Sequence, residues 1–150
     1  MFLKIQYSRK SYYSKITNQF IEENMKIRVY FEDTDAGGIV YHTNYIKYCE
    51  RARSEAFFSE GLVPLEGEKS GFVVRKIDAN FLASARLGDM LSVKTKIMTI
   101  KSSSITLLQE VWSENVKLFY MEILLVYVAD EKIRRIPQEF KELFENISKS

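Results

Sequence analysis

The feature that most constrains the fold is a series of β-rich runs in the second half of the chain, separated by short polar breaks. The breaks span only three or four residues and fit antiparallel hairpins, because a parallel crossover needs about a dozen residues or more. This half of the chain therefore predicts one antiparallel sheet. The expected strands are residues 72–81, 91–100, 104–112 and 117–128, and the breaks are residues 86–89, 101–103 and 113–115.

Two further elements precede this sheet. Residues 27–31 are apolar at every second position, which predicts a strand with one buried face. After a polar loop, apolar residues recur at helical spacing over residues 44–60, and Gly61 is typical of the position just past a helix end. The face expected to be buried comprises Tyr45, Cys49, Ala52 and Ala56. These elements together predict an α+β fold in which a single sheet wraps around a long helix.

The last expected strand is unusual because it is apolar on both faces. Leu124 and Val126 lie on one face, and Ile123 and Leu125 lie on the other. One face would pack on the helix, and the other needs cover that a second subunit could supply. Beyond this strand, Pro137 begins a short terminal helix with apolar residues at three- and four-residue spacing.

The charge balance argues against a nucleic-acid ligand. The chain of 150 residues has a net charge of +2, and residues 1–24 hold four of its 22 basic and two of its 20 acidic residues. The remainder is therefore neutral, with eighteen residues of each sign. A neutral body offers no electrostatic footprint for DNA or RNA.

The cysteine and histidine content limits the possible metal and redox chemistry. Cys49 is the single cysteine, so an intrachain disulfide is excluded, and one Cys with one His gives no recognisable metal-ligand spacing. No stretch reaches the ~18 apolar residues that span a bilayer, and the N-terminus lacks the apolar region of a signal peptide. We therefore expect a cytoplasmic protein with no metal, no cofactor and no membrane span.

Residues 1–24 differ from the rest of the chain in showing no sustained period. We expect an unstructured extension that can be deleted, or a true start at Met25. The Ser- and Tyr-rich, acid-poor composition leaves a transit peptide open. The domain itself is expected to cover residues 25–150.

The candidate for chemistry is the loop before the expected helix. Three carboxylates lie within four residues, followed by two glycines and then by His42, the only histidine of the chain. The amides at a helix N-terminus can hold an oxyanion, and a nearby carboxylate can attack a carbonyl or activate water against it. The pattern therefore fits hydrolytic acyl transfer. Asp and Gly in a strand-to-helix loop are, however, more often turn formers and helix caps than catalytic residues.

The order of residues in this region favours the catalytic interpretation over turn formation and capping. The stretch VYFEDTDAGGIVYHTNYIKYCERARSE, residues 29–55, closely resembles the signature of acyl-CoA thioesterases related to 4-hydroxybenzoyl-CoA thioesterase, nearest the subgroup associated with the Tol–Pal system. The resemblance continues through residues 71–76 and 83–89. It implies a hotdog fold, in which an antiparallel sheet wraps a long helix and subunits pair edge to edge into dimers or tetramers.

The resemblance also implies roles for individual residues. Asp35 matches the catalytic carboxylate, as nucleophile or as general base, and the backbone amide of His42 would polarise the thioester carbonyl. Gly38, Tyr41 and Lys101 are the expected substrate-binding residues, with Lys101 near the phosphates of coenzyme A. Arg75, Lys76 and Arg86 are alternatives for that contact. In other hotdog thioesterases the carboxylate lies on the helix, which makes Glu50 the second candidate.

The expected reaction is hydrolysis of an acyl-CoA to a free acid and coenzyme A. A protein that binds an acyl chain or an acyl carrier protein, with incidental turnover, is the alternative from another class. A dehydratase that pairs His42 with Glu50 is a third, although the proline-containing histidine loop of dehydratases is missing here. Asp33 is expected to accept backbone amides, and Cys49 to be a core residue.

Overall fold

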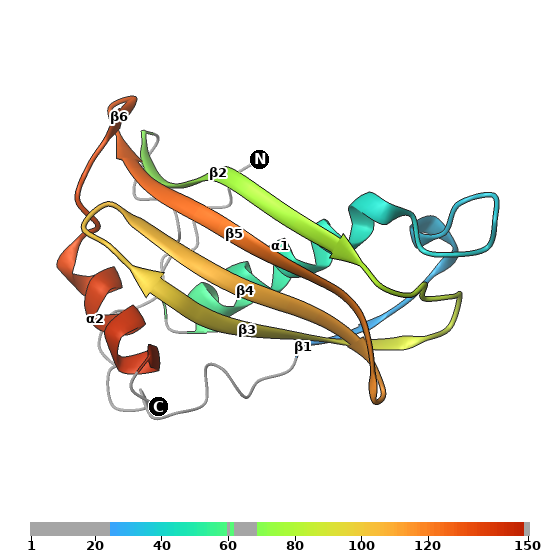
Figure 1. The fold of residues 1–150 in the computed structure, drawn as a ribbon. Helices are drawn as coiled ribbons and strands as arrows, with labels where there is room; N and C mark the ends of the chain where they lie inside the picture. Colours follow the sequence, from blue (N-terminus) through green and yellow to red (C-terminus); the bar gives the residue numbers. More distant parts are fainter. Residues whose placement is uncertain (1–24, 60, 62–68, 149–150) are drawn as a thin grey trace.

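The computed structural model describes residues 25–59, 61 and 69–148, which form six strands and two α-helices (Figure 1). The expected N-terminal extension lies outside the described residues, and so does Glu60. The elements are β1 (Met25–Arg28), α1 (His42–Ser59), β2 (Ser70–Phe81), β3 (Met90–Ile100), β4 (Ser104–Ser113), β5 (Val116–Ala129), β6 (Lys132–Ile133) and α2 (Gln138–Ser148), with a 3-10 turn at Phe31–Asp33.

The strands form one antiparallel sheet in the order β1-β3-β4-β5-β2, with β6 paired to the end of β5. This confirms the antiparallel sheet that the short breaks predict. The short strand β6 was not expected. Strand β2 is long and lies at one edge of the sheet, where its outer side pairs with no strand of the described chain.

Helix α1 lies along the concave face of the curled sheet (Figure 1). It begins two residues before the expected start, and Tyr45, Cys49 and Ala52 are buried as its spacing predicts. Tyr48 and Phe57 of the same helix are also buried. A sheet curled round a long helix confirms the predicted α+β architecture.

A polar residue lies in the middle of this core. Gln109 of β4 is fully buried, and its Nε2 donates to the Cys49 carbonyl and to Thr95 Oγ1, both at 3.0 Å. Its Oε1 accepts a hydrogen bond of 2.7 Å from Arg53 Nη1. Because both ends of the amide are bonded, its burial carries no penalty for unsatisfied polar atoms. The amide also ties α1 to β3 and β4.

Aromatic rings fill the end of the core beneath α2. We call this group the α2 aromatic cluster. Its rings lie 5.3–6.3 Å apart, at the separations that aromatic pairs prefer. Phe140 and Phe144 are buried as the spacing of the terminal helix predicts. The members of the cluster are Phe57, Phe72, Tyr127, Phe140 and Phe144.

The prediction of a strand over residues 27–31 is wrong for its second half. Strand β1 ends at Arg28, and Phe31 is 80% exposed although the alternation predicts burial. The Asp33 carboxylate accepts the Tyr30 amide at 2.8 Å and starts a 3-10 turn, which rotates Phe31 away from the core. A local side-chain bond therefore overrides the strand pattern.

The two apolar faces of β5 are partly covered by other residues of the same chain. Ile123 and Leu125 are buried on the face toward α1. On the opposite face Val126 is buried as well, while Leu124 is half-buried. Among the described residues, no helix is long and apolar enough to cross a bilayer.

Candidate active site

The loop between β1 and α1 is a small hairpin. Thr34 and Val40 form a β-bridge, and the Asp35 amide donates to the Ile39 carbonyl at 2.9 Å. The turn closes when the Gly38 amide donates to the Asp35 carbonyl at 3.0 Å, with φ +76° at Gly38. Residues with a side chain rarely adopt this φ, so glycine is required at this position. Asp35 is therefore the first residue of a hydrogen-bonded turn.

The carboxylate of Asp35 is held by the turn that it begins. The Gly37 amide donates to Asp35 Oδ1 at 2.8 Å. A Cβ on Gly37 would lie only 3.1 Å from the same oxygen, so glycine leaves the room that the carboxylate occupies. Asp35 is exposed, and its Oδ2 has no hydrogen-bond partner in the described part of the chain. One oxygen is oriented and the other is open to a substrate.

Asp33 connects the base of this hairpin to helix α1. Its carboxylate accepts the Tyr30 amide, and its carbonyl accepts the Tyr41 amide at 2.9 Å and Asn44 Nδ2 at 2.8 Å. Burial raises the pKa of Tyr48 beneath it, and the charge of Asp33 adds to that effect. The expectation that Asp33 shapes the loop through backbone amides is confirmed.

The connection between β2 and β3 forms a second support. The Val40 amide donates to the Ala85 carbonyl at 2.9 Å, and Ile39 bridges to Arg86. The Ala85 amide in turn donates to the buried hydroxyl of Tyr45 at 2.9 Å. Loop, connection and helix are therefore joined at Ala85, which explains how segments far apart in sequence fix the Asp35 turn.

Helix α1 begins at His42, directly after the hairpin. The first backbone bond across its start runs from the Asn44 amide to the Tyr41 carbonyl, at 2.9 Å. Among the described residues, no group accepts the His42 amide. The His42 ring packs edge-on against Tyr41, with centroids 4.5 Å apart, and against Phe81 at 6.2 Å. The hairpin thus ends at an amide that is available to an oxyanion.

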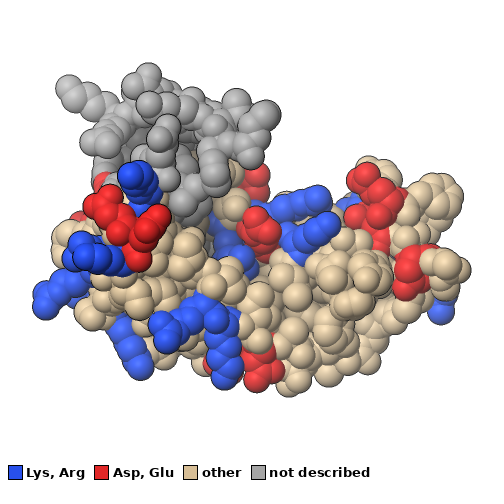
Figure 2. All heavy atoms as spheres, turned by 90° about the horizontal axis from the view of Figure 1, so that it is seen from above, with Lys and Arg blue, Asp and Glu red and all other residues tan. Residues whose placement is uncertain are grey.

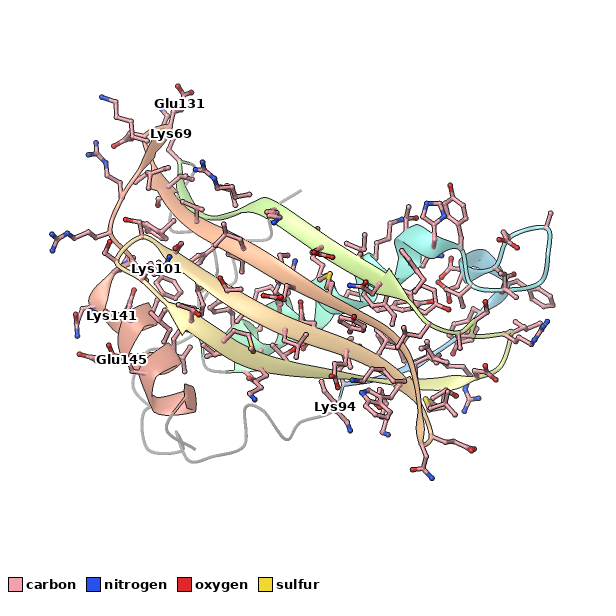
Figure 3. All side chains as sticks on the ribbon, viewed as in Figure 1. Lys69, Lys94, Lys101, Glu131, Lys141 and Glu145 are labelled. Atoms are coloured by element: carbon pink, nitrogen blue, oxygen red, sulfur yellow. The ribbon has the colours of Figure 1, made fainter. Side chains whose placement is uncertain are left out.

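The other expected substrate contacts lie apart from one another. Tyr41 is 46% exposed beside His42, and Gly38 lies in the turn itself. Lys101, in contrast, lies at the opposite end of the sheet, in the β3–β4 turn (Figure 3). A single chain therefore does not bring Lys101 together with Asp35. Of the alternatives, Arg86 is the one beside the hairpin, through its bridge to Ile39.

Charge is distributed unevenly between these two ends. Figure 2 shows mainly acidic residues at the end where Figure 1 places the β1–α1 loop, and several basic residues together with acidic ones at the other end. The loop contributes Glu32, Asp33 and Asp35. At the Lys101 end, the Ser102 carbonyl accepts the Ile136 amide at 2.8 Å, which places the basic residues just before Ile136 next to the turn.

Glu50 and Cys49, the other residues considered for catalysis, both lie on helix α1. Glu50 is exposed on the third turn. Cys49 is fully buried, and burial raises its pKa to about 12, an effect that the Arg53 charge reduces. Cys49 is therefore a core residue, as expected. The described residues contain no group of three or more His, Cys, Asp or Glu that could hold a metal ion.

Phe81 is a neighbour of the site that the sequence did not single out. It is the last residue of β2, is 50% exposed, and its ring faces His42, Tyr45 and Phe119. The sequence signal is weak, because a terminal Phe of a strand is usually read as core. Its position just before the connection at residues 83–89 is the only hint.

Known proteins are similar to this chain in sequence and architecture. Residues 37–120 match the family model described as thioesterase superfamily. The acyl-CoA thioesterase YbgC of Helicobacter pylori is 42% identical over 82% of this chain and all of its own length. The acyl-CoA thioester hydrolase YbgC of Escherichia coli is 41% identical over 77% of this chain and 93% of its own. A probable thioesterase from Bartonella henselae has a TM-score of 0.70 and 32% identity, over 76% of this chain and 98% of that one.

Proposed function

The chain belongs to the thioesterase superfamily and has its hotdog fold, and from this premise we propose that it hydrolyses acyl-CoA thioesters with Asp35 as the catalytic carboxylate. The observation that carries the proposal is the Asp35 turn. Its Oδ1 is bonded to the Gly37 amide, its Oδ2 is open, and the free amide of His42 follows at the start of α1. Carboxylate and oxyanion donor come from one short segment.

The amide of His42 would hold the carbonyl oxygen of the thioester as it gains negative charge. A donor that is already oriented in the resting protein needs no reorganisation at the moment of reaction. Asp35 would supply the other half of the chemistry through Oδ2. The imidazole of His42 is not needed for the leaving group, because the thiolate of coenzyme A departs readily.

Two routes are compatible with this arrangement. As a nucleophile, Asp35 Oδ2 attacks the carbonyl carbon, the C–S bond breaks, and the thiolate leaves and takes a proton from water. Water then cleaves the mixed anhydride and restores the carboxylate. As a general base, Asp35 instead takes a proton from a water molecule, which attacks the carbonyl and expels the same thiolate. Both routes give a free acid and coenzyme A.

We propose that the complete site needs two subunits. Lys101 lies at the far end of the sheet from Asp35, and the free edge of β2 is the place where a second sheet can pair. In an antiparallel pair of β2 strands, opposite ends of the two sheets come to the same end of the dimer. Lys101 of the partner subunit would then approach the phosphates of a coenzyme A whose thioester lies at Asp35. Sedimentation should find a dimer or tetramer at micromolar concentration, and a stable monomer would refute this.

Location and partners complete the proposal. A cytoplasmic protein of the Tol–Pal-associated subgroup, acting on acyl-CoA or on acyl carrier protein, is the assignment that residues 29–55 favour. Residues 25–150 are proposed as the catalytic domain, with residues 1–24 as an extension.

The activity is tested by a panel of acyl-CoAs of graded chain length, with free thiol measured as the product. Steady release of thiol at catalytic enzyme concentration is the expected result. If the chain binds acyl-CoA tightly but releases no thiol from any member, the alternative role as an acyl-binding interaction protein replaces this proposal.

A further inference from the structure

Phe81 is supported on one side and open on the other. Its ring packs against Phe119 with centroids 5.0 Å apart, and against Tyr45 at 6.0 Å. Phe119 and Tyr45 stack on each other at 5.4 Å, and both are buried. Half of Phe81 nevertheless remains exposed. The ring is thus held in place by the core while it presents an apolar surface outward.

The exposed surface of Phe81 belongs to a row of rings beside the candidate catalytic groups. Phe81 contacts the His42 ring at 6.2 Å, and His42 contacts Tyr41 at 4.5 Å. Tyr41 and Phe81 are each about half exposed, at 46% and 50%. Among the described residues, the ion pairs Lys117–Glu110 and Lys141–Glu145 lie outside this row. Three aromatic rings therefore lie together at the start of α1, beside the His42 amide.

The position of the row determines what can occupy it. A thioester carbonyl held by the His42 amide has the sulfur on one side of its carbon and the acyl chain on the other. His42 lies in the middle of the row, between Tyr41 and Phe81, so an acyl chain that leaves the carbonyl on the Phe81 side can follow the rings. An apolar chain gains free energy when it covers these rings, and an acetyl group is too short to reach beyond the first of them.

We propose that Phe81 binds the acyl group and makes the enzyme prefer apolar acyl chains longer than acetyl. This inference rests on the proposed thioesterase function and assigns a residue to its substrate selectivity. The contacts with Tyr45 and Phe119 hold the Phe81 ring in one orientation. A side chain that selects substrates by chain length needs such support. Selectivity then appears as a ratio of kcat/KM values between long and short substrates.

The test compares octanoyl-CoA with acetyl-CoA in the full chain. Phe81→Ala should lower the ratio of their kcat/KM values by about tenfold, because loss of an apolar contact typically costs ~10- to 200-fold in discrimination. The kcat/KM for octanoyl-CoA should fall more than that for acetyl-CoA, because only the longer chain reaches the Phe81 ring. Phe81→Leu should keep most of the ratio, since it restores apolar area.

Ile133→Ala is the matched control, because Ile133 is apolar, 53% exposed and lies at the opposite end of the sheet. Its ratio should equal that of the wild type. The inference is overturned if Phe81→Ala leaves the ratio unchanged, if Ile133→Ala lowers it equally, or if Phe81→Ala acts only by breaking the oligomer in sedimentation. If the wild type released thiol from no acyl-CoA of the graded panel, the proposed function itself would be wrong.

Discussion

The two ends of the curled sheet are built by different means. At the Asp35 end, backbone hydrogen bonds join the hairpin to the β2–β3 connection above a buried stack of Tyr45 and Phe119, and Asp35 and Phe81 stay exposed. At the other end, the rings of the α2 aromatic cluster are the contacts, and they are buried. Exposed side chains at the Asp35 end are available to a substrate, whereas the buried rings at the other end stabilise the fold.

The largest expected effect separates stability from activity at the α2 end. Phe57→Ala should lower the free energy of unfolding by about 3–5 kcal/mol, the usual cost of removing a buried Phe, because Phe57 contacts Phe72, Phe140 and Phe144. Turnover per folded molecule should be unchanged. Phe58→Ala is the control, because Phe58 is adjacent in sequence but 42% exposed. Urea unfolding that finds equal losses for both variants would break the comparison.

The second-largest expected effect is a loss of activity on removal of the His42 imidazole, at the Asp35 end. His42→Ala should lower kcat by about tenfold through lost positioning, because the substitution leaves the backbone amide in place. The shape of the pH–rate profile should be the same in the variant. A loss of ~10²-fold or more, together with a flattened profile, would make the imidazole a proton-transfer group and overturn the assignment to the amide.

The two glycines of the turn sharpen the comparison within the Asp35 end. Gly37→Ala should reduce kcat several-fold with little change in thermal midpoint, because the new Cβ meets the movable Asp35 carboxylate at 3.1 Å. Gly38→Ala should instead destabilise the fold by about 1 kcal/mol, since its φ is +76°. If both glycines affected stability alone, the carboxylate would not need the orientation that Gly37 allows.

The smallest expected effect is an acid-dependent one on the outer face of the sheet. Burial alone would raise the pKa of Glu110, but hydrogen bonds from Lys117 at 2.8 Å and Trp112 at 2.8 Å outweigh it and lower the pKa below its ordinary 4.5. A lowered pKa in the folded state means that Glu110 stabilises the fold above pH 4.5 and loses this contribution as the pH falls through its folded pKa.

Glu110→Gln should therefore reduce stability at neutral pH by less than about 1 kcal/mol and converge with the wild type in acid. Figure 3 places Lys94 in the same region, and its Nζ lies 4.4 Å from the Trp112 ring. Glu122→Gln, at an exposed residue of β5, serves as the control and should show no such convergence. Thermal midpoints measured from pH 3 to 7 decide this, and parallel curves for the wild type and Glu110→Gln would contradict it.

How far the sequence predicted the molecule differs between the two ends. Short breaks and helical spacing are local signals, so the antiparallel sheet, α1 and the buried rings of α2 were predictable. The end of β1 was not, because the bond from the Tyr30 amide to Asp33 competes with the strand pattern. The support at Ala85 and the exposure of Phe81 depend on segments that meet only in the folded chain.

The placement of Lys101 shows the same limit more sharply. Its turn was predicted as a break between strands, and the structure has it there. That this turn lies at the end of the sheet opposite Asp35 follows from strand direction and curl, which spacing along the sequence does not encode. Arg86, an alternative for the same role, lies beside the hairpin because Ile39 bridges to it.

The central claim is that hydrolysis depends on Asp35, and the rate of thiol release by Asp35→Asn tests it most directly. The amide is isosteric but neither basic nor nucleophilic, so kcat should fall by at least ~10²-fold. The thermal midpoint should stay near that of the wild type, because Asp35 is exposed. Glu50→Gln, measured beside it, should retain most of its activity. If Asp35→Asn kept half of its turnover while Glu50→Gln lost it, the catalytic carboxylate would lie on helix α1 and the account would be wrong.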